Sequence, residues 1–300
     1  MYKIILNIVL LLSVVDHVVW AKENKDAPLT SSDPNQEEVY HAVLEKKNMG
    51  YATLLLGSES GLSKQQRQSI EKRIDKICDL MKDKRRLYSS ETRFVQYVFY
   101  HLKSNYLVNY KADAQFSELL TGSTYDCVTG TALLALVFDR LGMKYQILET
   151  YSHVCIKIQS DSTHMLLEPT LKDGVYANGK QIYERLKKMQ SEKKEQVLKV
   201  LSSSYKSVDV NYYCTKINLL QLIGILYFNN AAQGLSEKKY ESSIYYAKIA
   251  NMLYPSVRTQ GFLVYSMDNL LKDDSVDFKS KMTYYKKYKY LIDESLSVLK

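Results

Sequence analysis

The stretch that decides the fold is residues 125–170, which read YDCVTGTALLALVFDRLGMKYQILETYSHVCIKIQSDSTHMLLEPT. Its first half is apolar on more than one side and closes at Gly142, a pattern typical of a buried helix. Its second half holds three short β-rich runs, KYQILET, HVCIKIQ and HMLLEPT, separated by the turn-like segments YS and SDST. We therefore predict an α+β fold in which one buried helix packs on antiparallel strands.

Cys127 stands at the first turn of the predicted helix, directly after a loop that contains Gly122 and Ser123. A thiol at a helix N-terminus feels a partial positive charge and unpaired backbone N–H groups, which favour the nucleophilic thiolate. Asp126 acts in the opposite sense, because a neighbouring carboxylate raises the pKa of a thiol. Cys127 is therefore a candidate nucleophile that needs a cationic partner, and an ordinary buried cysteine is the alternative interpretation.

His153 and Glu168 supply the groups that such a nucleophile needs. His153 starts the second predicted strand, and Glu168 ends the third, directly before Pro169. An imidazole can accept the thiol proton and later return it to the leaving group. A carboxylate on an adjacent strand can fix the ring tautomer and stabilise the imidazolium. The sequence order predicts a catalytic triad of Cys127, His153 and Glu168, although each residue alone also fits a structural role.

The remaining cysteines and histidines give weaker signals. Cys155 lies two residues after His153 and so on the same strand face, which predicts packing against the buried helix or, alternatively, a disulfide with Cys127. His164 has no evident acid partner and is left outside the site. Four cysteines permit two disulfides in three pairings, but Cys78, Cys127, Cys155 and Cys214 form no compact framework. Because no Cys/His cluster has zinc-finger spacing, we expect no metal and no other cofactor.

The quoted stretch resembles the core of the transglutaminase-like superfamily. It has a Cys that opens a helix, a Leu-rich continuation ending in Leu-Gly, a strand-borne His-Val and an acid-Pro-Thr. The resemblance covers residues 110–170, and the preceding segment FVQYVFYHLKSNYLVNY fits the helix that commonly comes before this core. It implies a papain-like α+β fold and cysteine-dependent peptide or amide chemistry. Glu168 stands where the family usually has Asp, and Tyr125 and Asp126 stand where it often has Gly and Asn, Glu or Gln.

Two functions are consistent with these residues. The first is an exported enzyme that attacks an amide carbonyl of a protein or peptide, forms a thioester on Cys127, and releases the acyl group to water or to an amine. Its oxyanion would be held by the backbone N–H of Cys127, with Tyr110 as a candidate second donor. The alternative is a non-catalytic interaction protein that uses the same scaffold and the C-terminal helices to bind a partner protein or peptide.

The N-terminus predicts export. It reads MYKIILNIVLLLSVVDHVVWA, with one lysine ahead of an apolar run and small residues before a cleavage site after Ala21. We expect a signal peptide over residues 1–21 and a periplasmic or secreted mature protein. A membrane-anchoring helix is the alternative, but it would place Asp16 and His17 at a cost near the hydrocarbon core. The polar residues 22–36 are predicted to be a flexible leader, with order beginning near Glu37.

Helical patterns flank the core on both sides. Upstream, three segments between residues 37 and 109 are helical, and we assign residues 37–180 to a transglutaminase-like domain that includes these N-terminal helices. In the second segment apolar residues recur at three and four positions and predict one buried stripe: Ile70, Ile74, Ile77, Leu80 and Met81.

Residues 181–300 are predicted to be helical throughout. Within them GILYFNNAAQGLSEKKYESSIYYAKIANMLYP has small and aromatic residues at the offsets of a tetratricopeptide unit, a combination with this core that is seen in bacterial relatives. These residues are Tyr227, Ala231, Tyr240, Ser243 and Ala250, with Pro255 closing the second helix. A plain helical hairpin is the alternative to a tetratricopeptide-like region that binds a partner protein.

The net charge of +8 does not by itself predict a polyanionic partner. The lysines are scattered along amphipathic helices, and no recognised nucleic-acid module accompanies them. We therefore predict no nucleic-acid partner, and a membrane partner only if the signal segment stays uncleaved.

Overall fold

The computed structural model describes residues 34–45, 47, 49–150, 153–161, 163–191 and 214–298. The predicted signal peptide lies outside these ranges, as does the predicted leader except for its last three residues. Those residues belong to α3 (Pro34–Leu44), so the first helix of the described residues starts before Glu37, where order is predicted to begin. Within the described ranges, no helix is long and apolar enough to cross a membrane.

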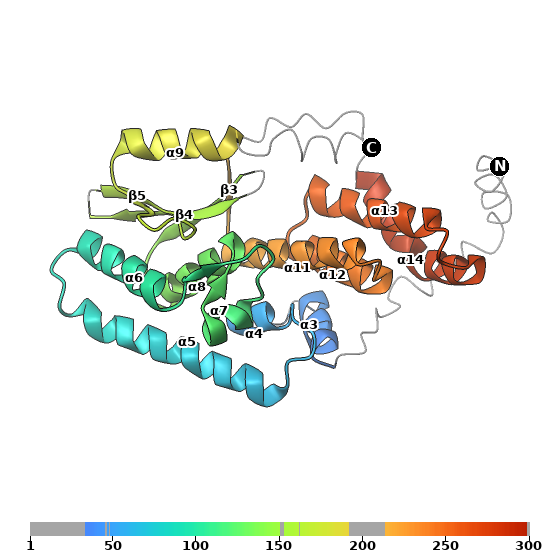
Figure 1. Cartoon of the computed structure of the whole chain (residues 1–300), viewed down its shortest axis with the longest axis horizontal. Helices are drawn as coiled ribbons and strands as arrows, with labels where there is room; N and C mark the ends of the chain where they lie inside the picture. Colours follow the sequence, from blue (N-terminus) through green and yellow to red (C-terminus); the bar gives the residue numbers. More distant parts are fainter. Residues whose placement is uncertain are drawn as a thin grey trace.

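A five-stranded antiparallel sheet in the order β6-β5-β4-β3-β7 lies toward one end of the molecule (Figure 1). Its central strands are the three predicted β-rich runs, so the α+β class with antiparallel strands is confirmed. The edge strand next to β3 is β7, which lies in the region where only helices are predicted. The helical prediction is wrong for these three residues, because three residues are too few to show an alternation of apolar and polar side chains. The strands are β3 (Tyr145–Glu149), β4 (Val154–Ser160), β5 (Thr163–Leu167), β6 (Val175–Tyr176) and β7 (Thr215–Ile217).

Helices cover both faces of this sheet (Figure 1). On one face lie α6 (Glu91–Asn105) and α8 (Cys127–Arg140), and on the other lies α9 (Gly179–Ser191). Strand alternation directs Val154 and Ile156 to the main core with α8, and Cys155 to a smaller cluster with Ile182 of α9. The prediction that Cys155 packs against the buried helix is therefore wrong, because it points to the opposite face of β4.

The helix α8 begins where the sequence predicts, at Cys127. Asp126 is its N-cap, and the Asp126 side chain accepts hydrogen bonds from the N–H and the hydroxyl of Thr129. Side chains from Val128 to Phe138 are all buried, which explains why the helix is apolar on every side. Gly142 follows the helix with φ of 67°, a conformation that glycine adopts without strain.

The N-terminal helices are α4 (Tyr51–Leu56), α5 (Lys64–Arg85), α6 and α7 (Phe116–Gly122). The predicted stripe of α5 is buried except at Leu80, which is 38% exposed. Cys78 takes its place in the core, since it lies four residues after Ile74 and so on the same face.

The C-terminal region consists of α11 (Leu219–Ser236), α12 (Tyr240–Leu253), α13 (Val257–Lys272) and α14 (Phe278–Val298). The predicted hairpin is formed by α11 and α12. Small residues let the two helices approach: Ser243 Oγ donates to the carbonyl of Ala231 at 2.8 Å, and a Cβ on Gly234 would lie 3.3 Å from the Ser243 nitrogen. A helical C-terminal region is thus confirmed.

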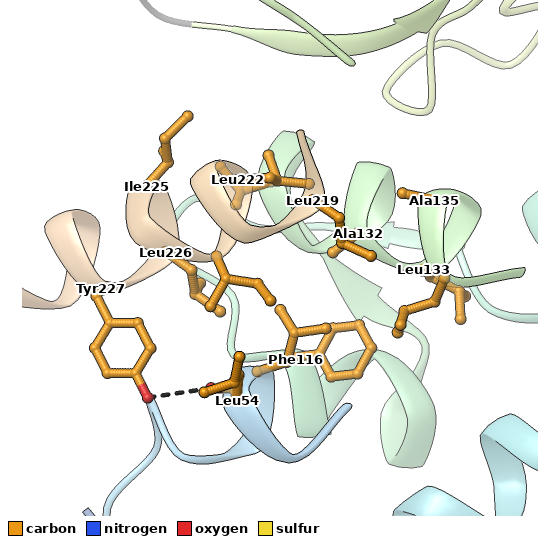
Figure 2. Packing of buried hydrophobic residues seen from close by; sticks show 14 of the residues in the cluster. Leu54, Phe116, Ala132, Leu133, Ala135, Leu219, Leu222, Ile225, Leu226 and Tyr227 are labelled. Atoms are coloured by element: carbon orange, nitrogen blue, oxygen red, sulfur yellow. Dashed lines mark hydrogen bonds between the residues drawn. The ribbon is translucent and has the colours of Figure 1, made fainter. Parts of the chain in front are cut away.

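Helix α11 also joins this region to the core (Figure 2). Leu219, Leu222 and Leu226 gather with Ala132 of α8 and Phe116 of α7 in one apolar cluster. Tyr227 is fully buried, and its hydroxyl donates to the carbonyl of Leu54 in α4 at 3.1 Å. Helix α8 therefore packs on elements that precede it and elements that follow it in the sequence.

Candidate catalytic site

The structure brings His153 and Glu168 into direct contact at one end of the sheet. His153 immediately precedes β4, and Glu168 immediately follows β5, which pairs with β4. Nε2 of His153 lies 2.7 Å from Oε1 and 2.6 Å from Oε2 of Glu168. The two side chains are 12% and 0% exposed. Because Nε2 contacts the carboxylate, Nδ1 is the ring nitrogen left for proton exchange with a thiol.

Further donors surround the Glu168 carboxylate. Oε1 accepts from the N–H of Thr170 at 3.2 Å and from its hydroxyl at 2.7 Å, and Oε2 accepts from Nη2 of Arg185 at 3.1 Å. Burial alone would raise the pKa of Glu168, but the hydrogen bond and charge of His153, with help from Thr170 and Arg185, lower this pKa. The carboxylate is therefore ionised at neutral pH although it is buried.

Gly174 holds the backbone of Glu168 in place. The N–H of Glu168 donates to the carbonyl of Gly174 at 2.7 Å, which closes the loop between β5 and β6. A Cβ on Gly174 would lie 2.0 Å from the Glu168 carbonyl oxygen and 2.9 Å from Cζ of Phe99. Only glycine fits at this position without displacing the residue that carries the carboxylate.

Cys127 and Thr131 attach the start of β4 to the start of α8. The two residues are one helical turn apart and so share a helix face. Thr131 donates its hydroxyl to the carbonyl of Val154 at 3.2 Å, while the backbone N–H of Val154 acts on the Cys127 thiol as a hydrogen-bond donor. His153 directly precedes Val154 in the chain, so this contact ties the start of α8 to the residue that follows the candidate base.

The Cys127 thiol is protonated at neutral pH. Burial, then the charges of Asp126 and Glu168, raise the pKa of Cys127 to about 12, while the N–H groups of Val154 and of Cys127 itself act in the opposite direction. The sequence predicts the opposing effect of Asp126 but omits burial, which is the largest cause. The favourable effect expected from the helix N-terminus is therefore outweighed.

Tyr110 lies close enough to this thiol for their charges to interact. It belongs to β1 (Asn109–Tyr110), which pairs in parallel with β2 (Thr124–Tyr125) just before α8. The Tyr110 side chain is 57% exposed, and its ring packs edge-on against Tyr125 with 5.8 Å between centroids. Burial and then the charges of Cys127 and Asp126 raise the pKa of Tyr110, so its hydroxyl remains a hydrogen-bond donor at neutral pH.

No protein-family model matches the chain, and no similar curated protein or solved structure was found. The case for a function therefore depends on the geometry of the site. All four cysteines are free thiols, so Cys127 and Cys155 do not form the disulfide that the sequence leaves open. His164 is exposed on β5, where it pairs with Gln159, and takes no part in the His153 and Glu168 contact.

Lys103 of α6 joins the two halves of the site. Its Nζ lies 2.5 Å from the Tyr125 hydroxyl and 2.8 Å from the carbonyl of Pro169, and it stands 4.7 Å from the centre of the Tyr125 ring. Tyr125 is two residues before Cys127, and Pro169 directly follows Glu168. The ammonium group therefore links the segment of the candidate nucleophile to the segment of the acid.

Sequence reasoning missed Lys103, Gly174 and Arg185. A lysine within the apolar segment FVQYVFYHLK and a glycine shortly after Glu-Pro-Thr are the signals that point to the first two. Arg185 stands among several charged residues of α9, and nothing in its local pattern distinguishes it from them.

Proposed function

We propose that this protein is a cysteine-dependent amide or peptide hydrolase, or acyltransferase, of transglutaminase-like type. Cys127 is the nucleophile, His153 the general base and Glu168 the acid that orients it. The contact between His153 and Glu168, at the sheet end where Cys127 opens α8, carries this proposal. A papain-like form of the fold is part of it, supported by a helix that starts at the cysteine and packs on the antiparallel sheet.

The first half of the reaction forms a thioester. Nδ1 of His153 takes the proton from the Cys127 sulfur, and the sulfur electron pair attacks the carbonyl carbon of the substrate. A carbon–sulfur bond forms while the carbonyl π electrons move to oxygen. The tetrahedral intermediate then expels the amine, which takes the proton back from His153. Glu168 stabilises the transient imidazolium through Nε2.

The second half releases the acyl group. Water, or an amine in the acyltransferase case, gives its proton to His153 and attacks the thioester carbonyl. The carbon–sulfur bond breaks, the proton returns to Cys127, and the resting thiol is restored.

The oxyanion of each tetrahedral intermediate is held by backbone and side-chain donors. The N–H of Cys127 lies at the first turn of α8, where helix N–H groups have no partner within the helix. The Tyr110 hydroxyl, which stays protonated, is the second donor. Each such donor contributes on the order of 3 kcal/mol to the stability of the transition state in comparable sites.

The wider assignments belong to the same proposal. The mature protein is exported after cleavage near Ala21 and acts on a protein or peptide outside the cytoplasm. The helices beyond residue 181 form a tetratricopeptide-like region that holds a partner protein or the substrate. The close α11–α12 crossing at Ala231 and Ser243 supports this region.

Thiol alkylation tests the pairing of Cys127 with His153. With a thiol pKa of about 12, little thiolate forms spontaneously at pH 7, so alkylation by iodoacetamide depends on the base. We expect His153→Ala to slow labelling of Cys127 by about 100-fold or more, measured by peptide mass mapping. His164→Ala, at an exposed strand histidine outside the site, is the matched control and should label at the wild-type rate. Equal labelling in both variants would contradict the proposed base.

A further inference from the structure

Arg185 of α9 lies beyond residues 127–168, which hold the proposed triad, and contacts the triad at Glu168. We propose that Arg185 is a positioning residue, which together with Thr170 holds the Glu168 carboxylate in the orientation that contacts His153. This inference rests on the proposed function and adds a fourth participant to it. Arg185 acts through Glu168 and does not itself touch the reacting atoms.

The contacts around the carboxylate carry this inference. Oε2 of Glu168 lies 2.6 Å from Nε2 of His153 and 3.1 Å from Nη2 of Arg185. Oε1 lies 2.7 Å from the same Nε2 and 2.7 Å from the Thr170 hydroxyl. Each oxygen therefore contacts His153 and one further donor residue. A carboxylate held at both oxygens cannot rotate about its terminal torsion without breaking a bond.

The length of the acid explains why such restraint is needed. Glutamate has one more rotatable bond than the aspartate that is usual in the resembled family, so it loses more conformational entropy when fixed in one orientation. Glu168 is completely buried and the Arg185 side chain is 11% exposed, so their ion pair is little screened by water. The extra partners offset the greater freedom of the longer side chain.

Packing of α9 brings Arg185 to this end of the sheet. Ile182 and Met189 of the same helix are buried in the cluster that contains Leu148, Cys155 and Leu166 of the sheet. Arg185 lies three residues after Ile182 and four before Met189, so it shares their helix face. The Arg185 guanidinium is thus held in position by a helix that packs on the sheet, and not by a loop.

Charge makes the role of Arg185 measurable. A cation beside the Glu168 and His153 pair opposes uptake of a proton by that pair, whichever of the two residues receives it. Lys103 is a second cation that interacts electrostatically with Glu168, but its ammonium group donates hydrogen bonds to the Tyr125 hydroxyl and the Pro169 carbonyl. The other titratable groups that interact electrostatically with this carboxylate are Tyr110, Tyr125, Cys127, Cys155 and Tyr176.

The test compares Arg185→Met, Arg185→Lys and Lys187→Met in the full chain. Lys187 is an exposed residue of α9, so its substitution removes the same charge from the same helix away from the site. The pH dependence of Cys127 alkylation is measured for each protein. We expect the acidic limb of Arg185→Met to move up by about one pH unit and its plateau rate to fall about tenfold. Arg185→Lys keeps the positive charge, so its acidic limb should lie near that of the wild type while its plateau rate stays lower. Lys187→Met should match the wild type in both.

A second measurement separates this inference from the proposed function. The ring nitrogens of His153 are titrated by NMR in the same four proteins, which needs neither a substrate nor a reactive thiol. The inference is supported if the pH midpoint of the His153 titration moves up in Arg185→Met and returns in Arg185→Lys. This result would hold even if Cys127 is alkylated at the wild-type rate in His153→Ala and the proposed function fails. If neither the titration nor the alkylation limb moves in Arg185→Met, or if Lys187→Met moves them equally, Arg185 does not position the acid. If Arg185→Met does not fold, Arg185→Lys alone decides the inference. The inference then fails if Arg185→Lys has the wild-type plateau rate of Cys127 alkylation and the wild-type NMR titration of the His153 ring.

Discussion

Replacing Cys127 by alanine is expected to abolish acyl transfer and leave the fold intact. The change deletes the only atom of the site that can form the thioester, and losses on the order of 10⁶ in rate are typical when a nucleophile is removed. Alanine is small enough to occupy the first position of α8 without strain, and the Asp126 cap does not depend on the thiol. The measurement is release of p-nitrophenol from p-nitrophenyl acetate, followed by amine release from peptide amides.

Cys214→Ala is the matched control for this prediction. Cys214 is a free and partly buried thiol that directly precedes β7 and makes no contact needed by the mechanism. Its variant should retain the wild-type rate. If Cys127→Ala also retains that rate, the enzyme hypothesis fails and the interaction-protein alternative is favoured.

Replacing Glu168 by glutamine is expected to reduce the rate by about 10² to 10⁴ without abolishing it. Glutamine keeps the size and one acceptor oxygen, but it loses the charge that stabilises the imidazolium of His153. The structure adds a second effect, since the Glu168 charge that contacts both the Arg185 guanidinium and the transient imidazolium would then be missing. Steady-state rates against the same ester, with circular dichroism to verify folding, measure the loss.

Glu149→Gln controls for the loss of a buried ion pair. Glu149 lies at the end of β3, where Oε1 is 2.6 Å from Nη2 of Arg258 and Oε2 accepts from the Tyr254 hydroxyl at 2.6 Å. Both glutamine variants should lose stability, because each removes the charge of a buried carboxylate from an ion pair with an arginine. Only Glu168→Gln should lose turnover in the folded protein. Full activity in Glu168→Gln would mean that the site works with a dyad or another acid.

Local patterns are sufficient to predict the elements that carry the residues of the proposed triad. The helix that starts at Cys127 and the strands beside His153 and Glu168 can be predicted because their hydrophobic patterns and turn residues are contained within short segments. The contact between His153 and Glu168 follows from the pairing of those adjacent strands. The sequence could therefore predict that histidine and acid meet.

Features that depend on distant parts of the chain cannot be predicted from local patterns. β7 gains its strand character from pairing with β3, because its own three residues show no pattern. The sequence places Cys155 on the wrong face because His153 lies just outside β4 and does not define its alternation, in which Val154, Ile156 and Ile158 face the main core and Cys155 faces the smaller cluster. Arg185 and Lys103 reach the site through helix packing that no local signal reveals.

The thiol pKa shows the same limit in electrostatic terms. The sequence identifies the helix N-terminus and Asp126 as opposing influences on Cys127. Burial of the thiol and the charge of Glu168 arise only from the tertiary structure, and together with Asp126 they favour the protonated form. In the proposed mechanism the nucleophilic thiolate is therefore generated by proton transfer to His153 during the reaction and is not present beforehand as a stable thiolate.

The acyl-enzyme itself tests the central claim most directly. The full chain is mixed with p-nitrophenyl acetate, quenched in acid at short times, and its intact mass and peptide map are recorded. We expect one acetyl group on Cys127 that forms before steady state, disappears as the ester is consumed, and is absent or greatly reduced in His153→Ala. Acetylation that falls on another residue, or that reaches Cys127 at the same rate in His153→Ala, would contradict a triad of Cys127, His153 and Glu168.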